Sequence, residues 1–323
     1  MKEIRISRHG GPEVLEYVAA NISGPKNGEV QIRHTQIGLN FIDTYHRSGL
    51  YPMSLPSGIG LEACGVVEAV GSGVEHLVVG DRVAYGAGPI GAYSQIRNMP
   101  AGRVSKLPDS VDDETAAAIM LKGMTARYLL RETYKVQAGD TILFHAAAGG
   151  VGQIAIQWAN ALGATVIGTV GSTAKGEMAT ALGCHHVINY NEENVADRVR
   201  EITDGKGVPV VYDGVGQSTI DASLDSLQPR GLLVSFGNAS GPVTDFDLGK
   251  LAAKGSLYIT RPSLMAYVAT DEALAANARD LFEMVGSGKV KINVNQRYRL
   301  SEAAQAHRDL EARKTTGSSV LSA

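Results

Sequence analysis

The pattern of apolar and polar positions divides the chain into three parts. In residues 1–124, short runs of alternating apolar and polar side chains predict half-buried strands, so we expect this part to be rich in β-structure. In residues 125–261, short apolar runs alternate with longer helical patterns, which predicts a doubly wound parallel sheet. From residue 262, two helical patterns flank one strand, and we expect residues 262–323 to return to the first domain.

The apolar runs of the middle part predict a six-stranded sheet, which matches the two halves of a dinucleotide-binding fold. Its strands are expected at residues 141–145, 164–169, 186–189, 208–212, 231–236 and 257–260. The helices between them are expected at residues 151–162, 175–182, 194–203, 219–227 and 247–253. In the flanking parts we expect strands at residues 30–35, 65–70, 82–85 and near 290–294, and helices at 41–48, from 112 to 120, at 272–285 and at 301–312.

A turn of small residues between the first of these strands and the helix after it carries the clearest chemical signal. Small side chains let the backbone turn sharply and lie against a diphosphate, and the helix that follows directs its positive end at the phosphates. A glycine turn alone occurs by chance, but one between a strand and a helix indicates a dinucleotide site rather than an ordinary connection. The residues expected to contact the diphosphate are Gly149, Gly150, Val151 and Gly152.

The end of the second strand indicates which nicotinamide cofactor binds. An NAD site usually places Asp or Glu there to bind the ribose hydroxyls. This chain has Gly171, Ser172 and Thr173, followed by Lys175. Hydroxyls and an ammonium group favour a 2′-phosphate, which a carboxylate would repel. We therefore predict NADPH over NADH; the alternative for Lys175 is a solvated lysine in the first turn of a helix.

Composition narrows the class of protein. The chain has 323 residues, of which 44% are hydrophobic and 20% charged, and these values fit a globular protein with two domains. A net charge of −3 gives no electrostatic reason to expect binding to nucleic acid or an anionic membrane. The chain shows no apolar signal-peptide core and no membrane-spanning run, and its two cysteines cannot form a disulfide framework. We therefore expect a cytoplasmic protein.

Six segments resemble a known family: NFIDTY at 40–45, RSGLYP at 47–52, HAAAGGVG at 145–152, VYD at 211–213, VSFGN at 234–238 and GSLY at 255–258. Together they resemble the medium-chain dehydrogenase/reductase superfamily, and within it the zeta-crystallin-like NADPH quinone oxidoreductases. The resemblance implies a GroES-like catalytic domain formed by residues 1–124 and 262–323, beside a Rossmann NADPH-binding domain at 125–261. It also implies a quinone substrate and a homodimer that pairs through the edge strand 257–260.

The zinc ligands of alcohol dehydrogenases in this superfamily have no counterpart in the sequence. Those enzymes need a Cys, a His and a third ligand on the catalytic zinc, and a four-Cys structural loop. Residues 38–41 contain no Cys, and Leu61 stands where a Gly-His-Glu motif would place its histidine. We therefore expect no metal site, which disfavours alcohol oxidation because that reaction depends on zinc to stabilise an alkoxide.

The resemblance implies which residues surround the ligands. Asn40 and Thr44 are expected beside the nicotinamide half, and Asn40 and Tyr51 are the candidates that position the substrate. Tyr45 and Asp43 are weaker candidates, because Asp43 also suits the first turn of a helix and the tyrosines also suit ordinary packing. The other implied cofactor contacts are Tyr128, Tyr190, Phe236, Gly237, Asn238, Ser263, Leu264 and Arg313.

Two implied contacts also have a reason in the sequence itself. Residues 236–238 follow the fifth strand, and the carboxyl ends of parallel strands face the ligand crevice. Arg313 suits bidentate binding of the 2′-phosphate, although it also suits an exposed helix end. Asp213 closes the fourth strand and is interpreted as a turn residue.

Three functions remain open on the sequence. An NADPH:quinone reductase needs little beyond positioning, because a quinone is already strongly electrophilic. An NADPH-dependent enone or enoyl reductase needs a proton donor, for which Tyr51 is the candidate. The third is a nonenzymatic NADPH-binding protein. A role in RNA binding has little support from the acidic charge balance.

Overall fold

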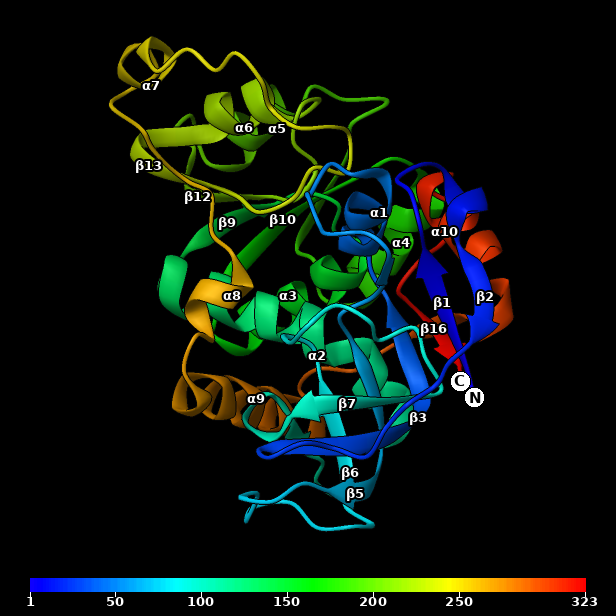
Figure 1. The fold of residues 1–323 in the computed structure, drawn as a ribbon. Helices are drawn as coiled ribbons and strands as arrows, with labels where there is room; N and C mark the ends of the chain where they lie inside the picture. The colour runs from blue at the N-terminus through cyan, green and yellow to red at the C-terminus, as the bar shows by residue number, and fades with distance from the viewer. The chain divides into compact units, whose positions relative to one another are not determined.

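The computed structural model describes residues 1–323 and divides them into two compact units (Figure 1). Unit 1 comprises Met1–Met124, Val268–Gly286 and Ile292–Ala323. Unit 2 comprises Thr125–Tyr267 and Ser287–Lys291. No helix of either unit is both long and apolar enough to cross a bilayer.

Unit 1 is built on two sheets. The smaller has the order β2 (Glu16–Ala19), β1 (Lys2–Ile6), β4 (Ser57–Gly58). The seven-stranded sheet has the order β15 (Val294–Arg299), β16 (Ser318–Ser322), β3 (Glu29–Leu39), β5 (Ala63–Val70), β6 (Arg82–Tyr85), β8 (Ser105–Lys106), with β7 (Ile96–Pro100) also pairing with β3. Its pairs are antiparallel except β15 with β16. The helices are α1 (Phe41–Ser48), α2 (Asp113–Tyr128, which belongs to unit 2 from Thr125 on), α9 (Asp271–Gly286) and α10 (Ala303–Glu311), and short 3₁₀ turns cover Pro12–Val14, Ala101–Arg103 and Leu300–Glu302.

Unit 2 contains the predicted six-stranded sheet. Its order is β11 (His186–Asn189), β10 (Thr165–Val170), β9 (Thr141–Phe144), β12 (Val208–Asp213), β13 (Leu227–Ser235), β14 (Tyr258–Thr260). Every pair is parallel. In chain order the strands run third, second, first, fourth, fifth, sixth, which is the order of doubly wound dinucleotide-binding folds. The predicted fold class is therefore confirmed, and the strand order reverses direction between β9 and β12.

Short helices connect these strands. They are α3 (Gly150–Ala161), α4 (Thr173–Ala181), α5 (Val195–Ile202), α6 (Ile220–Ser226), α7 (Gly249–Ala253) and α8 (Leu264–Tyr267), and a π-helical turn covers Leu129–Thr133. Helices α3 and α4 pack on β10, whereas α5 and α6 lie side by side and contact β11 to β13 (Figure 1). Sheet residues from Leu143 to Leu233 pack against α5 and α6 in one continuous core.

One predicted strand lies elsewhere in the chain. The strand expected near 290–294 is β15, which begins only at Val294. The cause is Gln157 on α3, whose side-chain amide donates to the carbonyl of Lys291 and accepts from its N–H, both at 2.9 Å. Both backbone groups of Lys291 are therefore used by a side chain rather than by a sheet. Three other predicted strands were too short, because β3 continues to Leu39, β5 begins at Ala63 and β13 begins at Leu227. The helix predicted to begin over residues 112–120 is α2, which continues to Tyr128.

Candidate active site

The turn between β9 and α3 is shaped to hold a diphosphate. Ala146 adopts a left-handed conformation with φ 54°, and the N–H of Gly149 donates to its carbonyl at 2.9 Å. A Cβ on Gly152 would lie 2.5 Å from that same carbonyl oxygen, so only glycine fits there. The first helical hydrogen bond of α3 runs from the Gln153 N–H to the Gly149 carbonyl at 2.9 Å. The N–H groups at positions 150–152 precede it, and such groups at a helix start are ready to bind an anion.

A buried network of polar side chains holds His145, the residue that precedes this turn. His145, the residue before Ala146, accepts from the Thr169 hydroxyl through Nδ1 at 2.9 Å and donates through Nε2 to Ser223 Oγ at 3.0 Å. Ser223 in turn donates to Asp213 Oδ2 at 2.7 Å. The direction is fixed because a carboxylate only accepts. Burial lowers the pKa of His145, which keeps its ring neutral in this network.

Asp213 is a turn residue, as interpreted from the sequence. Its Oδ1 accepts from the N–H groups of Val215 at 2.8 Å and Gly216 at 3.0 Å, and the Thr219 hydroxyl also donates to it. The carboxylate is 1% exposed, so its bonds to backbone and hydroxyl donors are what make burial tolerable. The residue therefore organises the carboxyl end of β12 rather than facing a ligand.

The end of β10 brings together four of the predicted cofactor contacts. Ser172 is the N-cap of α4, and its Oγ accepts from the Lys175 N–H at 3.4 Å. The ring of Tyr190 lies over Gly171, where a Cβ would come within 2.3 Å of the tyrosine oxygen. Tyr190 remains 43% exposed, so its ring is accessible to a ligand. The end of β10 therefore brings together the Ser172 hydroxyl, the first turn of α4 with Lys175, and the aromatic ring of Tyr190.

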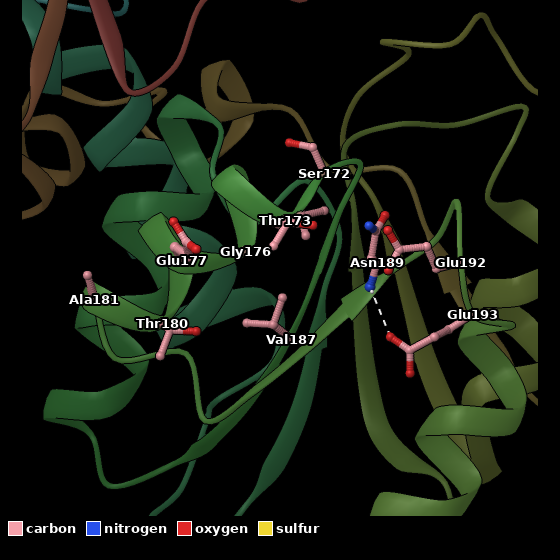
Figure 2. A pocket seen from close by; sticks show the side chains of 11 residues that line it. Ser172, Thr173, Gly176, Glu177, Thr180, Ala181, Val187, Asn189, Glu192 and Glu193 are labelled. Carbon is pink, nitrogen blue, oxygen red and sulfur yellow. Dashed lines mark hydrogen bonds between the residues drawn. The ribbon is translucent and has the colours of Figure 1, made fainter.

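A groove beside the end of β10 is lined by acidic side chains, unlike the strand end with Lys175. It is lined by α4, β11 and the turn after β11, and it includes Ser172 together with Glu177, Glu192 and Glu193. Figure 2 shows the Ser172 hydroxyl at the rim, directed away from Glu192 and Glu193. Three carboxylates repel a phosphate. The groove itself is therefore unsuited to a 2′-phosphate, and neither Lys175 nor Tyr190 lines it.

The loop after β13 packs against the ends of β9 and β12, the two strands between which the strand order reverses. The N–H of Phe236 donates to the Asp213 carbonyl at 2.8 Å, and its ring packs on Phe144 at the end of β9 with centroids 5.8 Å apart. A Cβ on Gly237 would lie 2.2 Å from the Gly214 carbonyl oxygen. Glycine at this position therefore lets two strand ends approach closely, and Asn238 follows at their edge. Ligands of doubly wound sheets bind at this point of strand reversal.

The remaining predicted contacts of unit 2 lie near its connections. Arg261 donates to the Gly237 carbonyl at 3.0 Å, and this bond holds the start of the segment that carries Ser263 and Leu264. Tyr128 is 2% exposed and stacks on Tyr267 with centroids 4.4 Å apart. Arg313 belongs to unit 1, where it follows α10 with a left-handed φ of 58°.

In unit 1, helix α1 carries most of the predicted residues. Asn40 is its N-cap, and the Asn40 N–H donates to Asp43 Oδ2 at 2.9 Å. Asp43 is therefore the first-turn carboxylate that the sequence favoured. The Thr44 hydroxyl donates to the Phe41 carbonyl at 2.7 Å. Tyr51 packs edge-on against Tyr45 with centroids 5.2 Å apart.

A chain of donors extends from Asp43 to the C-terminal helix α10. Arginine can only donate, so Arg47 donates to His307 Nδ1 at 3.0 Å, and His307 Nε2 then donates to Tyr93 at 3.1 Å. The Tyr93 hydroxyl donates to Asp43 Oδ2 at 2.9 Å. Desolvation raises the pKa of Asp43 to about 7, against these donors. This series of hydrogen bonds holds α1 against α10.

A buried ion pair that was not predicted from the sequence lies beside Asn40. Lys122 Nζ lies 3.1 Å from Glu62 Oε2, and the Asn40 amide donates to the same oxygen at 2.7 Å. The signal was present: Lys122 interrupts an apolar helical run, and a lysine in such a place needs a buried partner. No spacing rule identifies Glu62 as that partner.

The structure contains no group of three or more His, Cys, Asp or Glu side chains arranged to hold a metal ion. Leu61, at the position of the missing histidine, is buried with 4% exposure. Cys64 lies nearby, but its thiol donates to the Asp113 carbonyl at 2.9 Å, and burial raises its pKa to about 12.

Comparison with known proteins gives the same architecture. Residues 26–109 match the alcohol dehydrogenase GroES-like domain, and residues 150–278 match the zinc-binding dehydrogenase family model. A GroES-like domain with a six-stranded doubly wound sheet defines the class as a medium-chain dehydrogenase/reductase.

Full-length relatives narrow this class. The quinone oxidoreductase of Pseudomonas aeruginosa is 57% identical over 321 residues, covering 99% of both chains. The crystal structure of Escherichia coli quinone oxidoreductase complexed with NADPH has a TM-score of 0.98 at 52% identity and covers 100% of both chains. The 2-haloacrylate reductase of a Burkholderia species is 46% identical, covering 98% of this chain and 97% of the relative. The chain belongs to the quinone oxidoreductase family of the medium-chain dehydrogenases/reductases.

Proposed function

We propose that this chain is an NADPH:quinone oxidoreductase that transfers reducing equivalents from NADPH to a quinone without a metal ion. The observation that carries the proposal is full-length similarity to an enzyme whose crystal structure holds NADPH, at a TM-score of 0.98. The small-residue turn of this chain supports it independently, because a Cβ at Gly152 would clash with the Ala146 carbonyl and force open the turn that would hold a diphosphate.

The residues present fit NADPH. Gly149, Gly150, Val151 and Gly152 bind the diphosphate through the start of α3. Gly171, Ser172, Lys175, Tyr190 and Arg313 bind the 2′-phosphate end. The contacts proposed for the nicotinamide side are Asn40, Thr44, Tyr128, Phe236, Gly237, Asn238, Ser263 and Leu264. When bound, NADPH supplies the reducing equivalents, and the protein supplies orientation and exclusion of water.

Asn40 and Tyr51 are the residues we propose for positioning the substrate. Asn40 is held at the start of α1 by two buried carboxylates: its backbone N–H donates to Asp43 Oδ2, and its side-chain amide donates to Glu62 Oε2. The ring of Tyr51 is oriented by its edge contact with Tyr45 and by the bond from its N–H to the Tyr45 carbonyl at 3.1 Å. A fixed aromatic ring suits a flat quinone, because offset stacking and edge contacts both favour it. Positioning supplies most of the rate for such an electrophilic acceptor.

One observation favours a second candidate, reduction of an activated carbon–carbon double bond. The 2-haloacrylate reductase is 46% identical over nearly the whole chain. That reaction needs a proton at the α-carbon, and Tyr51 is the candidate donor. The two functions separate in an assay of NADPH oxidation against a panel of quinones and enones, with detection of semiquinone radicals. Turnover of quinones supports the first proposal; turnover of enones alone overturns it.

We also propose that the protein forms a homodimer, that its two domains divide at residues 124 and 261, and that it is cytoplasmic. Strand β14 ends the sheet of unit 2, with Tyr258 61% and Ile259 38% exposed, and such an edge can pair with a copy of itself. Residues 125–261 form the NADPH-binding domain, and residues 1–124 with 262–323 form the catalytic domain. We place the protein in the cytoplasm.

A further inference from the structure

We infer that Lys122 and Glu62 are a positioning pair that fixes the side-chain amide of Asn40 with its carbonyl oxygen toward the ligand. Asn40 would then accept a hydrogen bond from the NH₂ of the nicotinamide carboxamide. The inference rests on the proposed function, because it takes Asn40 to contact NADPH.

The three residues form one nearly buried cluster within unit 1. Asn40 Nδ2 lies 2.7 Å from Glu62 Oε2, and Lys122 Nζ lies 3.1 Å from that same atom. Glu62 is fully buried, and Lys122 and Asn40 are 6% and 4% exposed. The other carboxylate oxygen, Oε1, accepts from the backbone N–H of Leu121 at 2.8 Å.

The backbone around Glu62 is shaped for this carboxylate. A Cβ on Gly38 would lie 2.2 Å from Glu62 Oε2 and 2.3 Å from the Ala117 carbonyl oxygen. The Gly38 N–H also donates to the Glu62 backbone carbonyl at 2.9 Å. A side chain at position 38 would therefore displace the Glu62 carboxylate, so that Oε2 could no longer accept from both Asn40 and Lys122.

The charge on Glu62 decides which way the Asn40 amide faces. An amide has a donor end and an acceptor end, and coordinates alone do not distinguish them. An ionised carboxylate only accepts, so Asn40 must direct its NH₂ at Oε2 and its carbonyl oxygen elsewhere. Lys122 Nζ lies 3.1 Å from the same oxygen, and this ion pair makes the Glu62 carboxylate the acceptor for both neighbours. The other ionisable side chains near Glu62 are Asp43 and Tyr93, both of which interact with it electrostatically.

Stability alone does not explain such a pair. Desolvation of two buried charges offsets most of their attraction, and apolar residues of similar volume often stabilise a protein at least as well. An ionic pair is needed here if Glu62 and Lys122 determine which end of the Asn40 amide donates and which accepts. The same carbonyl oxygen would discriminate between a carboxamide, which donates, and a methyl ketone, which does not.

The 3-acetylpyridine analogue of NADPH tests this polarity, because a methyl group replaces the carboxamide NH₂. The informative variant is the double substitution Glu62→Gln with Lys122→Met. The fixed Leu121 N–H demands the oxygen of Gln at the Oε1 position, so the Gln NH₂ takes the Oε2 position. Without Lys122, Asn40 must turn its carbonyl oxygen to that NH₂ and present its own NH₂ to the ligand.

The measurement is the dissociation constant of NADPH and of the analogue by fluorescence titration, together with their kcat/KM values with one quinone. We expect the wild type to bind NADPH about tenfold more tightly than the analogue, as one hydrogen bond allows. The double variant is expected to lose this preference in both readouts. Lys122→Arg keeps the charge and is expected to retain it, as is the control Arg82→Met, which removes an ion pair with Asp113 in the same unit.

A preference that survives in the folded double variant overturns the inference. If the double variant does not fold, Glu62→Gln with Lys122→Leu is measured instead, because this pair also removes the ammonium group that would compete with the Leu121 N–H for the Gln oxygen, and an unchanged preference there also overturns the inference. Failure of the wild type to bind NADPH, or to reduce any acceptor with it, instead contradicts the proposed function.

Discussion

Gly152 lies so close to Ala146 that a Cβ on the glycine would come within 2.5 Å of the alanine carbonyl oxygen. This approach tightens the turn before α3, whose first N–H groups precede the first helical hydrogen bond from Gln153 to Gly149. Because the neighbouring atoms are backbone, no side chain can move aside to make room.

Gly152→Val is therefore expected to weaken NADPH binding at least about tenfold and to destabilise unit 2 by about 1–3 kcal/mol. The reason is that the turn must open and the amide groups lose their common direction. Fluorescence titration with NADPH and a urea unfolding curve measure the two effects. Gly24→Ala is the control, since nothing lies within 4 Å of its Cβ. Unaltered NADPH affinity in Gly152→Val would remove the turn from the binding site.

Lys175→Ala is expected to lower the preference for NADPH over NADH by about tenfold, because a charge-assisted hydrogen bond to the 2′-phosphate is lost. The measurement is the ratio of kcat/KM for the two cofactors. Lys206→Ala, an exposed lysine in the turn after α5, serves as the control. Equal changes for both cofactors would mean that Lys175 does not contact the 2′-phosphate.

Ser223→Ala is expected to destabilise the protein by about 1–3 kcal/mol, because it leaves the buried His145 Nε2–H and Asp213 without a shared partner. Since His145 directly precedes the small-residue turn, a weaker NADPH affinity should accompany the loss. Ser226→Ala in the same helix is the matched control, because Ser226 donates only to the Ala222 carbonyl. If the two variants unfold at the same temperature, the network does not stabilise the turn.

Buried histidines predict a loss of stability in acid. Burial lowers the pKa of His34 and of His307 to about 3, whereas the unfolded chain protonates these rings near pH 6.5. Their contribution is therefore complete above pH 6.5 and is lost as the pH falls toward 3, by up to about 1.4 kcal/mol per pH unit for each ring. Asp43 acts in the opposite direction, since its folded pKa of about 7 exceeds 3.8 and favours the folded state as the pH falls through that interval.

His307→Gln isolates one of these rings. Glutamine can accept from Arg47 and donate to Tyr93, so both hydrogen bonds remain while the titration is removed. Urea unfolding at pH 7 and pH 5 is expected to show a smaller pH-dependent loss in the variant than in the wild type. Identical losses would show that His307 is not a buried neutral ring.

The strands of the parallel sheet were predictable because they are short, continuous apolar runs between helical patterns. Strand β16 was not, although it lies between β15 and β3 in the larger sheet of unit 1. Its serines look like loop residues, and only the folded chain supplies their partners, such as the Ala118 carbonyl for Ser318 and Gln296 for Ser319. Tertiary hydrogen bonds of this kind leave no periodicity in the sequence.

In the candidate site too, some features were predictable from local sequence and others depend on tertiary contacts. The small-residue turn and the end of β10 follow from local sequence, because neighbouring residues create both the geometry and the charge. The Glu62–Lys122 pair joins residues about 60 positions apart, and its carboxylate is accommodated by a glycine on a third element. Contacts of such high sequence separation follow from the fold, so the pair was not predicted from the sequence.

The most direct test of the account is a single-turnover experiment in which the protein, saturated with NADPH, is mixed with a stoichiometric amount of a quinone. We predict that NADP⁺ and reduced quinone form together at a rate far above that of the uncatalysed mixture, and that Gly152→Val needs at least about tenfold more NADPH to reach its maximal rate. Bound NADPH that persists in the presence of every quinone tried would contradict the account.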